Sequence, residues 1–222
     1  MSDIGLSPEV ARAIMITVVV IMIGVFLGGF LVGSIPFGYI VGRLFYHTDI
    51  RRQGSGNIGA MNALRTLGKG GAATVLLLDA LKGFLPVLSA LYIFGKHLDP
   101  DFVQIAVALV AAGTVAGHCF SPWLRFRGGK GVATFIGALF GFCWPAGLVA
   151  VIGWVVGAAV TRYSSVGSML GCVAAAFAVW FVTQSLPETA FAIFAALLIV
   201  LKHRDNIARL RSGTEGPIRL GK

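Results

Sequence analysis

The chain has 222 residues, of which 57% are hydrophobic and only 12% are charged. Soluble domains carry about a quarter charged residues, so this composition excludes an ordinary soluble enzyme and indicates a single-domain helical membrane protein. The net charge of +9 would suggest nucleic acid as a ligand of a soluble protein, but the cations here lie in short loops between apolar runs, and we expect no nucleic-acid partner.

The first apolar segment occupies residues 13–44. The run from Ala13 to Phe45 is too long for the core of a signal peptide, and it has no clear small-x-small cleavage site. A helix needs about 20 residues to span a membrane, so this segment predicts the first transmembrane helix.

The first loop, residues 54–65, contains a G-x-G-x-x-G string. The string alone is a weak sign of a dinucleotide site, because a membrane segment and not a strand precedes it. Glycines nevertheless let backbone N–H groups approach an anion. A helix that begins near Asn57 would place Asn62 and Arg65 on one face, where Arg65 could hold phosphate oxygens with two hydrogen bonds. The alternative is a tight turn followed by an arginine that only sets topology.

The second and third apolar segments, residues 71–95 and 102–119, contain ionisable residues. Asp79 and Lys82 lie three residues apart in the second segment. Charges within a span are costly and are usually functional or paired, so these two either act in a site or pair with each other. His118 lies beside the loop that follows and is either functional or a satisfied histidine at the membrane interface.

The second loop, residues 125–134, contains Gly128, Gly129, Lys130 and Gly131 at the mouth of a predicted helix. The spacing differs from that of a Walker A loop, but glycines around a lysine are typical of a backbone nest for an anion. Thr134 would add a hydroxyl one turn later. A membrane anchor needs cations but does not need three glycines around one, so we favour anion binding.

Four apolar segments follow, at residues 131–144, 146–161, 164–184 and 188–201. The stretch 131–161 could instead be one helix with a kink near Trp144. Cytoplasmic loops carry an excess of Lys and Arg, and the basic residues gather at 43–70, 120–130, 162 and 202–222. Seven crossings, with the N-terminus outside and the C-terminus cytoplasmic, place all these stretches inside, whereas merging 131–161 would place the basic tail outside. We therefore predict seven transmembrane helices.

Pairs of small residues spaced four apart recur in the spans and predict close packing between helices. They are Gly24/Gly28, Gly29/Gly33, Gly113/Gly117, Gly137/Gly141, Gly153/Gly157 and Gly167/Gly171.

The tail begins with a third polar motif, residues 202–209. On a helix, His203 and Asn206 would share a face that Arg209 continues. The alternative is an amphipathic helix that lies on lipid headgroups.

The remaining chemistry is sparse. The three cysteines form no C-x-x-C pair, and we expect buried thiols. The sequence has no G-x-S-x-G elbow, no H-x4-D acyltransferase motif and no carboxylate cluster for a metal ion. A protein with many anion-binding groups and few nucleophiles suits a substrate that arrives already activated.

Taken together, these loops resemble the bacterial acyl-phosphate-dependent glycerol-3-phosphate acyltransferases, the PlsY family. The matching pieces are residues 33–36, 54–65, 79–83, 117–118, 126–134 and 202–209, in the family's order across nearly the whole chain. The resemblance implies one acyltransferase domain over residues 1–222, with residues 1–12 as an N-terminal extension and residues 202–222 as a cytoplasmic tail. It also implies a multi-pass protein of the bacterial inner membrane whose active site faces the cytoplasm.

The activity that the resemblance implies is transfer of a fatty acyl group from acyl phosphate to the 1-hydroxyl of glycerol 3-phosphate, giving lysophosphatidic acid and phosphate. It implies no cofactor and no covalent acyl-enzyme. The expected partners are the two substrates and membrane lipid, with the enzyme that supplies acyl phosphate as a further candidate. The proton of the hydroxyl would go either to His203 or to an oxygen of the acyl phosphate.

The motif match and the loop chemistry together define the expected site. By motif match, the residues that correspond to family site residues are Ser55, Asn57, Arg65, Lys130, Thr134, His203 and Asn206. We expect catalytic roles for Ser55, Arg65, Lys130, His203 and Asn206. We expect substrate binding by Gly54, Gly56, Asn57, Asn62, Gly128, Gly129, Gly131, Thr134 and Arg209.

Three other readings compete with this one. A transporter of anions tends to place its polar residues at the membrane midplane in two related halves, and this sequence shows neither feature. A membrane scaffold would have no use for three loops that combine glycines and cations. An enzyme that transfers a different group to a phosphorylated acceptor would use the same kind of loops.

Overall fold

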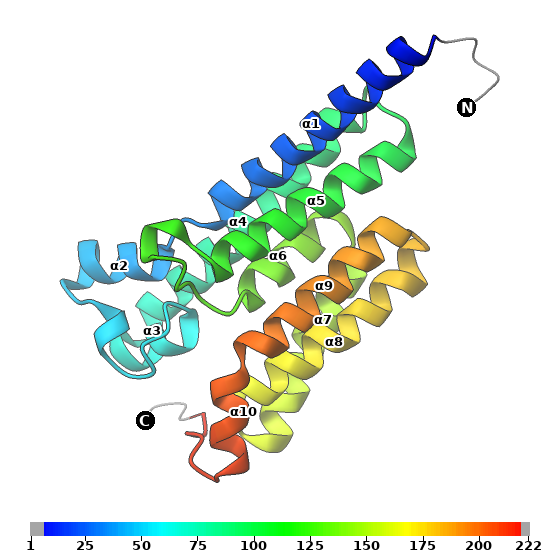
Figure 1. Cartoon of the computed structure of the whole chain (residues 1–222). Coiled ribbons are helices and arrows are strands. Elements are labelled where there is room, and N and C mark those ends of the chain that lie inside the picture. Colours follow the sequence, from blue (N-terminus) through cyan, green and yellow to red (C-terminus); the bar gives the residue numbers. More distant parts are fainter. Residues whose placement is uncertain (1–6, 219–222) are drawn as a thin grey trace.

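A computed structural model of the chain describes residues 7–218, and every regular element in that range is a helix (Figure 1). The predicted all-helical class is confirmed. The long helices are Pro8–Gly33 (α1), Gly68–Phe94 (α4), Pro100–Cys119 (α5), Trp144–Thr161 (α7), Ser164–Thr183 (α8) and Leu186–Lys202 (α9). The shorter ones are Phe37–Tyr46 (α2), Ala60–Thr66 (α3), Val132–Phe142 (α6) and Arg204–Arg211 (α10), with single 3-10 turns at Ile50–Arg52 (η1) and Pro122–Leu124 (η2).

Five apolar stretches are long enough to cross a membrane: Pro8–Tyr46, Gly68–Phe94, Pro100–Leu124, Trp144–Thr161 and Ser164–Thr183. A sixth results if Leu186–Lys202 and Arg204–Arg211, which are bent by 52° relative to each other, are taken together as one span. At 1.5 Å per residue, the 11 residues of α6 are too short to cross alone a hydrocarbon core that is about 30 Å thick. The protein is therefore a multi-pass helical membrane protein, and the count of seven crossings stays a prediction.

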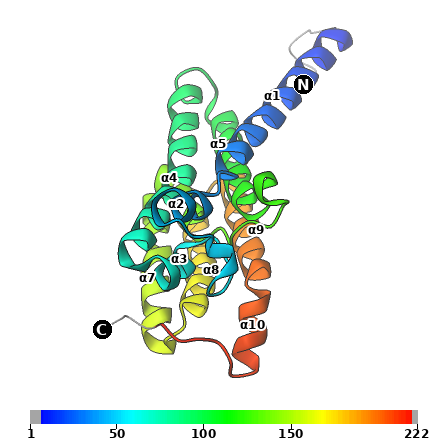
Figure 2. The ribbon, with the colours of Figure 1, turned by 90° about the vertical axis from the view of Figure 1, so that its left-hand side faces the viewer.

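The first apolar segment is not one helix, contrary to the continuous span expected over 13–44. α1 ends at Gly33, and α2 begins only at Phe37, after Pro36. Proline fixes its φ angle and lacks an N–H donor, so the chain turns here. α2 and α3 lie together at one end of the bundle, whereas α1 leans away from it (Figure 2). The expected N-terminal extension, residues 1–12, overlaps α1, which begins at Pro8, and its status as an extension stays a prediction. Residues 1–6 of it, and residues 219–222 of the tail, lie outside the described residues.

The stretch 131–161 forms a hairpin of two helices, which excludes the alternative of a single kinked helix. α6 ends at Phe142, and α7 turns back along it, so that Gly147 packs on the ring of Phe140. The end of α7 then meets the tail, where the Ile218 N–H donates to the Arg162 carbonyl at 2.8 Å. This reversal brings the basic stretches to the same end of the bundle, as the charge distribution predicted.

Most of the small-residue pairs pack as predicted. On α1 and α5, a Cβ at Gly33 would lie 2.1 Å from the Thr114 carbonyl oxygen, and one at Gly117 would lie 2.1 Å from that of Phe30. The glycine pairs of α7 and α8 also face each other, since a Cβ at Gly157 would lie 2.8 Å from the Cα of Gly167. The prediction is wrong for Gly24/Gly28, which contact nothing within 4 Å.

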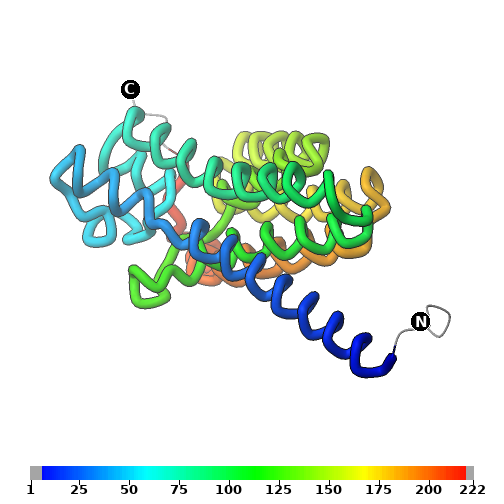
Figure 3. The backbone as a smooth tube through the Cα atoms, turned by 90° about the horizontal axis from the view of Figure 1, so that it is seen from above, coloured from blue at the N-terminus to red at the C-terminus, as the bar shows by residue number. Residues whose placement is uncertain are grey.

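The main core lies between α5, α6, α8 and α9. Its largest fully buried members are Val107, Val115, Phe135, Leu139 and Ile199. α6 packs on both α4 and α7. Seen from above, α1 diverges from the other helices towards its N-terminal end (Figure 3). Residues of α4, α6 and α7 line a hollow, and this hollow is the candidate site.

Candidate active site

A cavity of about 540 Å³ lies at the end of the bundle where the three polar motifs meet. One part of its wall is polar and comes from the first loop, the second loop, the α9–α10 junction and the tail. The other part is apolar and comes from α4, α6 and α7. The polar wall includes Ser55, Asn57, Arg65, Lys130, Ser165, His203, Asn206 and Glu215, and the apolar wall includes Ala73, Leu76, Ala80, Ile136, Phe140, Val151 and Trp154.

The first loop is built around the buried side chain of Asn62. Its amide oxygen accepts from the Ser55 N–H at 2.8 Å, and its amide nitrogen donates to the carbonyls of Ile50 at 2.7 Å and Asn57 at 2.8 Å. Gly54 and Gly56 have φ angles of +58° and +69°, which other residues rarely adopt. The Asn62 amide is thus used within the loop and, with Gly54 and Gly56, shapes it, whereas the expected roles of these three residues in binding stay predictions.

Arg65 is the free cation of this loop. It lies near the end of α3, its side chain is exposed, and it lines the cavity. Within residues 7–218 it makes no ion pair and no side-chain hydrogen bond, in contrast to Arg51, which binds Asp49 with two hydrogen bonds of 2.9 and 2.7 Å. Its guanidinium therefore keeps its donors available to a ligand, as a phosphate-binding role requires.

The second loop presents Lys130 and Gly131 to the cavity, but not Gly128 or Gly129. A Cβ at Gly128 would lie 2.0 Å from the His118 carbonyl oxygen, and one at Gly129 would lie 2.0 Å from the His118 ring. These two glycines are needed because the loop packs directly on the end of α5. Their expected role in substrate binding is thus not supported by their position.

The first turn of α6 opens into the cavity through Gly131, Val132 and Ala133. Gly131 is the N-cap with a φ angle of +86°, and no side chain caps the turn, so its backbone N–H groups remain open to an anion. Thr134, expected to bind substrate, is instead fully buried, and its carbonyl oxygen packs against Gly83 of α4. Lys130 and the helix N-terminus are therefore the groups of this loop that can hold an anion at the cavity.

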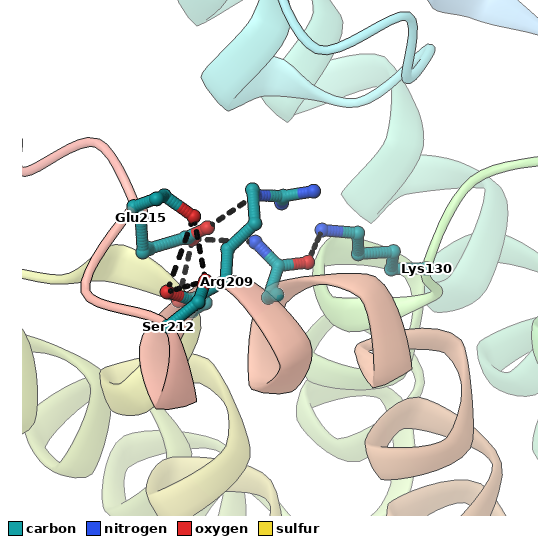
Figure 4. Close-up of polar contacts among 7 residues, drawn as sticks. Lys130, Arg209, Ser212 and Glu215 are labelled. Atoms are coloured by element: carbon teal, nitrogen blue, oxygen red, sulfur yellow. Dashed lines mark hydrogen bonds and ion pairs between the residues drawn. The ribbon is translucent and has the colours of Figure 1, made fainter.

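A polar network joins the second loop to the tail (Figure 4). The Lys130 ammonium donates to the Asn206 amide oxygen, and the Asn206 amide nitrogen donates to Glu215 at 2.6 Å. Glu215 also accepts from Ser165 at 2.9 Å and from Arg209 at 2.7 Å. Arg209 is bound to Glu215 and does not line the cavity, and its expected role in substrate binding stays a prediction.

His203 lies between α9 and α10 and is 3% exposed. Its Nδ1 lies 2.8 Å from the Ile199 carbonyl oxygen, which can only accept, so Nδ1 carries the proton. Burial and the charge of Lys130 lower the pKa of His203 to about 4. The imidazole is therefore neutral at pH 7, with Nε2 free to accept a hydrogen bond.

The pKa values of Lys130 and Glu215 are also shifted by their surroundings. Burial lowers the pKa of Lys130 to about 8, although Glu215 opposes the shift. Burial alone would raise the pKa of Glu215. The hydrogen bonds from Asn206 and Arg209 lower this pKa by more than burial raises it, so the net shift is downward. At pH 7 the site holds a charged lysine, a charged glutamate and a neutral histidine.

The cavity brings together residues that are more than a hundred positions apart. Of the residues predicted for the site, those in its wall are Ser55, Asn57, Asn62, Arg65, Lys130, Gly131, His203 and Asn206. Those outside its wall are Gly54, Gly56, Gly128, Gly129, Thr134 and Arg209.

Sequence reasoning missed Glu215 and Ser165. The sequence pattern assigned no role to Glu215. The available signal was its isolation, because it is the only carboxylate after Asp205 in a basic tail. Ser165 had no signal at all, since it depends on the tail folding back across the start of α8.

Chemically, the arrangement can hold two anionic groups next to a neutral imidazole. Arg65 supplies one anion site, and Lys130 with the α6 N-terminus supplies the other. The apolar wall can accommodate a hydrocarbon chain beside them.

Comparisons with known sequences agree on one family. The glycerol-3-phosphate acyltransferase family model matches residues 23–213. The glycerol-3-phosphate acyltransferase of Zymomonas mobilis is 46% identical over 204 residues, covering 87% of this chain and 94% of the relative. That of Rhodopseudomonas palustris strain BisB5 is 45% identical over 201 residues, covering 89% and 98%.

Solved structures give the same result. The crystal structure of PlsY (YgiH), an integral membrane glycerol 3-phosphate acyltransferase, in its glycerol 3-phosphate form matches with a TM-score of 0.81 and 33% identity, covering 89% of this chain and 96% of that one. The lysophosphatidic acid form matches with a TM-score of 0.78 and 31% identity, covering 89% and 95%.

Proposed function

The chain belongs to the PlsY family of glycerol-3-phosphate acyltransferases, and from this premise we propose that it uses acyl phosphate as the donor and releases lysophosphatidic acid and phosphate. The acyl group is transferred to the 1-hydroxyl of glycerol 3-phosphate. The observation that carries the proposal is the pairing of two separate anion sites with one apolar wall in a single cavity.

Each anion site suits one substrate. Arg65 holds the phosphate of glycerol 3-phosphate, because its planar guanidinium is unpaired and can donate two parallel hydrogen bonds. Ser55 and Asn57 lie in the wall beside it. Lys130 and the α6 N-terminus hold the phosphate of the donor, which is attached directly to the reacting carbonyl.

The apolar wall supports acyl phosphate over acyl-CoA. The acyl chain enters between α4 and α7 and lies over α6, against Leu76, Ile136 and Phe140. An acyl-CoA would have to place an adenine and a ribose phosphate as well, and its phosphates lie far from its thioester. A compact phosphate site next to an apolar wall fits the smaller donor.

Catalysis then rests on positioning and on charge stabilisation. His203 accepts a hydrogen bond from the 1-hydroxyl at Nε2 and orients it towards the carbonyl carbon. The new ester C–O bond forms and the C–O bond to phosphate breaks, while the hydroxyl proton passes through Nε2 of His203 to the departing phosphate, which leaves the imidazole neutral again. Phosphate is the better proton acceptor because its second pKa is about 6 or above, whereas the pKa of His203 is about 4. Holding the reactants in line can contribute about 7–11 kcal/mol.

The site faces the cytoplasm of a bacterial inner membrane in this proposal. The positive-inside rule supports this orientation, because Arg65, Lys130 and the tail share one end of the bundle. Acyl phosphate would then be delivered from the cytoplasmic side by the enzyme that makes it. Residues 1–222 act as one acyltransferase domain.

The decisive experiment measures phosphate release by purified protein from palmitoyl phosphate, with and without glycerol 3-phosphate, in the absence of metal and CoA. We expect release only with glycerol 3-phosphate, and we expect Lys130→Ala to lose most of it. Equal turnover with palmitoyl-CoA, in a preparation free of acyl phosphate, would contradict the proposed donor. Transport of glycerol 3-phosphate into vesicles without acylation would favour the transporter reading instead.

A further inference from the structure

The junction between α1 and α2, residues Ser34 to Pro36, is held by three side chains from distant parts of the sequence. The Lys82 ammonium, from the middle of α4, donates to the Ile35 carbonyl at 2.9 Å. The Ser121 hydroxyl donates to the Ser34 carbonyl at 2.6 Å, and the Trp123 indole N–H donates to the Ser34 hydroxyl at 2.9 Å. We call these three donors, Lys82, Ser121 and Trp123, the junction clamp.

Lys82 is buried and paired. Its ammonium lies 2.7 Å from Asp79 Oδ1, and both side chains are 2% exposed. The sequence left open whether these two charges act in a site or pair with each other, and the structure shows a pair that also reaches a third segment. His118 Nδ1 lies 3.6 Å from the same carboxylate oxygen, with its ring against Gly129 of the second loop.

The clamp is connected through α2 to the first loop. α2 starts directly after the junction, and its Gly38 lies so close to the loop that a Cβ there would be 1.8 Å from the Ile58 carbonyl oxygen. No side chain fits between the helix and the loop, so a shift of α2 moves the loop that carries Arg65.

The clamp is also connected to the second loop. Ser121 and Trp123 belong to the segment between α5 and α6 that ends at Lys130. Next to Lys82, Gly83 packs on the first turn of α6, where a Cβ would lie 2.0 Å from the Thr134 carbonyl oxygen. The clamp therefore connects the two loops that carry the two phosphate-binding cations, and the packing of Leu124 with Ile50 and Ile58 joins the same segments a second time.

We propose that the junction clamp is a positioning device that fixes the separation of Arg65 and Lys130, so that the two bound substrates meet in reacting geometry. This inference rests on the proposed function. Lys82 and Ser121 do not line the cavity, so they act through the two loops and not on substrate. Asp79, the ion-pair partner of Lys82, does line it, so Ser121→Ala is the variant that changes the clamp away from the cavity wall. Their loss should lower kcat while leaving KM for each substrate nearly unchanged, because each loop still binds its own anion.

The test must separate positioning from folding. Removing one partner of a buried ion pair is strongly destabilising, whereas removing both is far less so. We therefore compare Lys82→Met with the neutral double variant Asp79→Asn/Lys82→Met. Ser121→Ala removes a different donor without touching any charge. Thr114→Val is the matched control, because Thr114 is a fully buried hydroxyl whose only hydrogen-bond partner within residues 7–218 is the Ala111 carbonyl of its own helix.

We expect the double variant to regain most of the thermal stability that Lys82→Met loses, yet to keep a kcat at least ~10-fold below wild type with KM values within ~3-fold. Ser121→Ala should lose kcat several-fold, and Thr114→Val should not. Spin labels on cysteines at the exposed positions Arg52 and Arg127 should show a broader distance distribution in the double variant, a readout that needs no activity.

Recovery of kcat together with stability, or an unchanged kcat and distance distribution in Ser121→Ala, would overturn the clamp. A double variant that does not fold leaves Ser121→Ala to decide. If the wild-type protein shows no acyl transfer while its label distances behave as expected, the proposed function fails and the clamp stands as a structural device.

Discussion

At the scale of single residues, the site separates charges that bind ligands from charges that hold the protein. Arg65 has no protein partner within residues 7–218, whereas Arg209 is bound to Glu215 and Arg51 to Asp49. The positive-inside rule treats all arginines alike, so only their partners reveal which one is free to bind an anion.

Replacing Arg65 by lysine tests this distinction. Lysine keeps the charge but loses the planar pair of donors, so we expect a loss of ~10- to 100-fold in kcat/KM for glycerol 3-phosphate, with folding unchanged. Steady-state kinetics and thermal unfolding in detergent would measure both. Arg52→Lys is the control, because Arg52 belongs to the same segment but does not line the cavity. Normal kinetics in Arg65→Lys would return this residue to a role in topology.

The pKa of Lys130 predicts the alkaline limb of the pH profile. Lys130 is protonated below a pKa of about 8 and loses its charge as the pH rises through that value. Since kcat/KM reports the free enzyme, it should fall above pH 8. The limb should move to higher pH in Lys130→Arg, whose guanidinium stays charged, and should stay in place in Lys69→Arg. An identical limb in wild type and Lys130→Arg would assign it to another group.

At the scale of helices, close packing depends on which glycine pairs have partners. Gly117→Ala should lower the stability by ~1–3 kcal/mol, because the new methyl group would meet the Phe30 carbonyl oxygen of α1. Gly28→Ala should not destabilise, since nothing lies within 4 Å of Gly28. Thermal unfolding of the two variants in the same detergent provides the comparison. Equal losses of stability in both variants would mean that the α1–α5 contact is not the cause of the destabilisation.

The hollow between α4 and α7 predicts how chain length affects the rate. Val151→Trp on α7 should narrow the apolar wall and reduce turnover of palmitoyl phosphate more than that of a short-chain acyl phosphate. Val155→Trp, one turn further along α7 and outside the cavity wall, is the matched control. A uniform loss across chain lengths would argue against this path for the acyl chain.

At the scale of the whole molecule, the fold gathers its basic segments at one end and leaves Ser185 and Gln104, bonded at 2.9 Å, at the other. We predict that single cysteines near residues 60, 127 and 208 resist an impermeant thiol reagent in intact cells, and that one near residue 99 reacts. The three native cysteines are buried and should not interfere. Labelling of the tail from outside would contradict seven crossings.

The sequence by itself determined the class of protein, most of its apolar segments, the three polar motifs and the family. These features depend on composition, on hydrophobic run length and on short motifs, which are local properties of the chain. It also predicted correctly that glycines four apart pack helices together, except at Gly24/Gly28. The exception arises because a small residue permits a close approach between helices but does not determine whether another helix lies there.

Only the tertiary structure decided which motif residues face the cavity. The Asn62 amide is used by its own loop, Gly128 and Gly129 are needed to pack on His118, and Glu215 joins Asn206 to Ser165. Most of these roles depend on contacts between segments that lie far apart in the sequence, and even the short-range bonds of Asn62 depend on the conformation of its loop. A backbone nest for phosphate and a tight packing contact both require glycine. The difference between them is whether the glycine backbone faces an open cavity or another segment of the protein, and only the tertiary structure decides this.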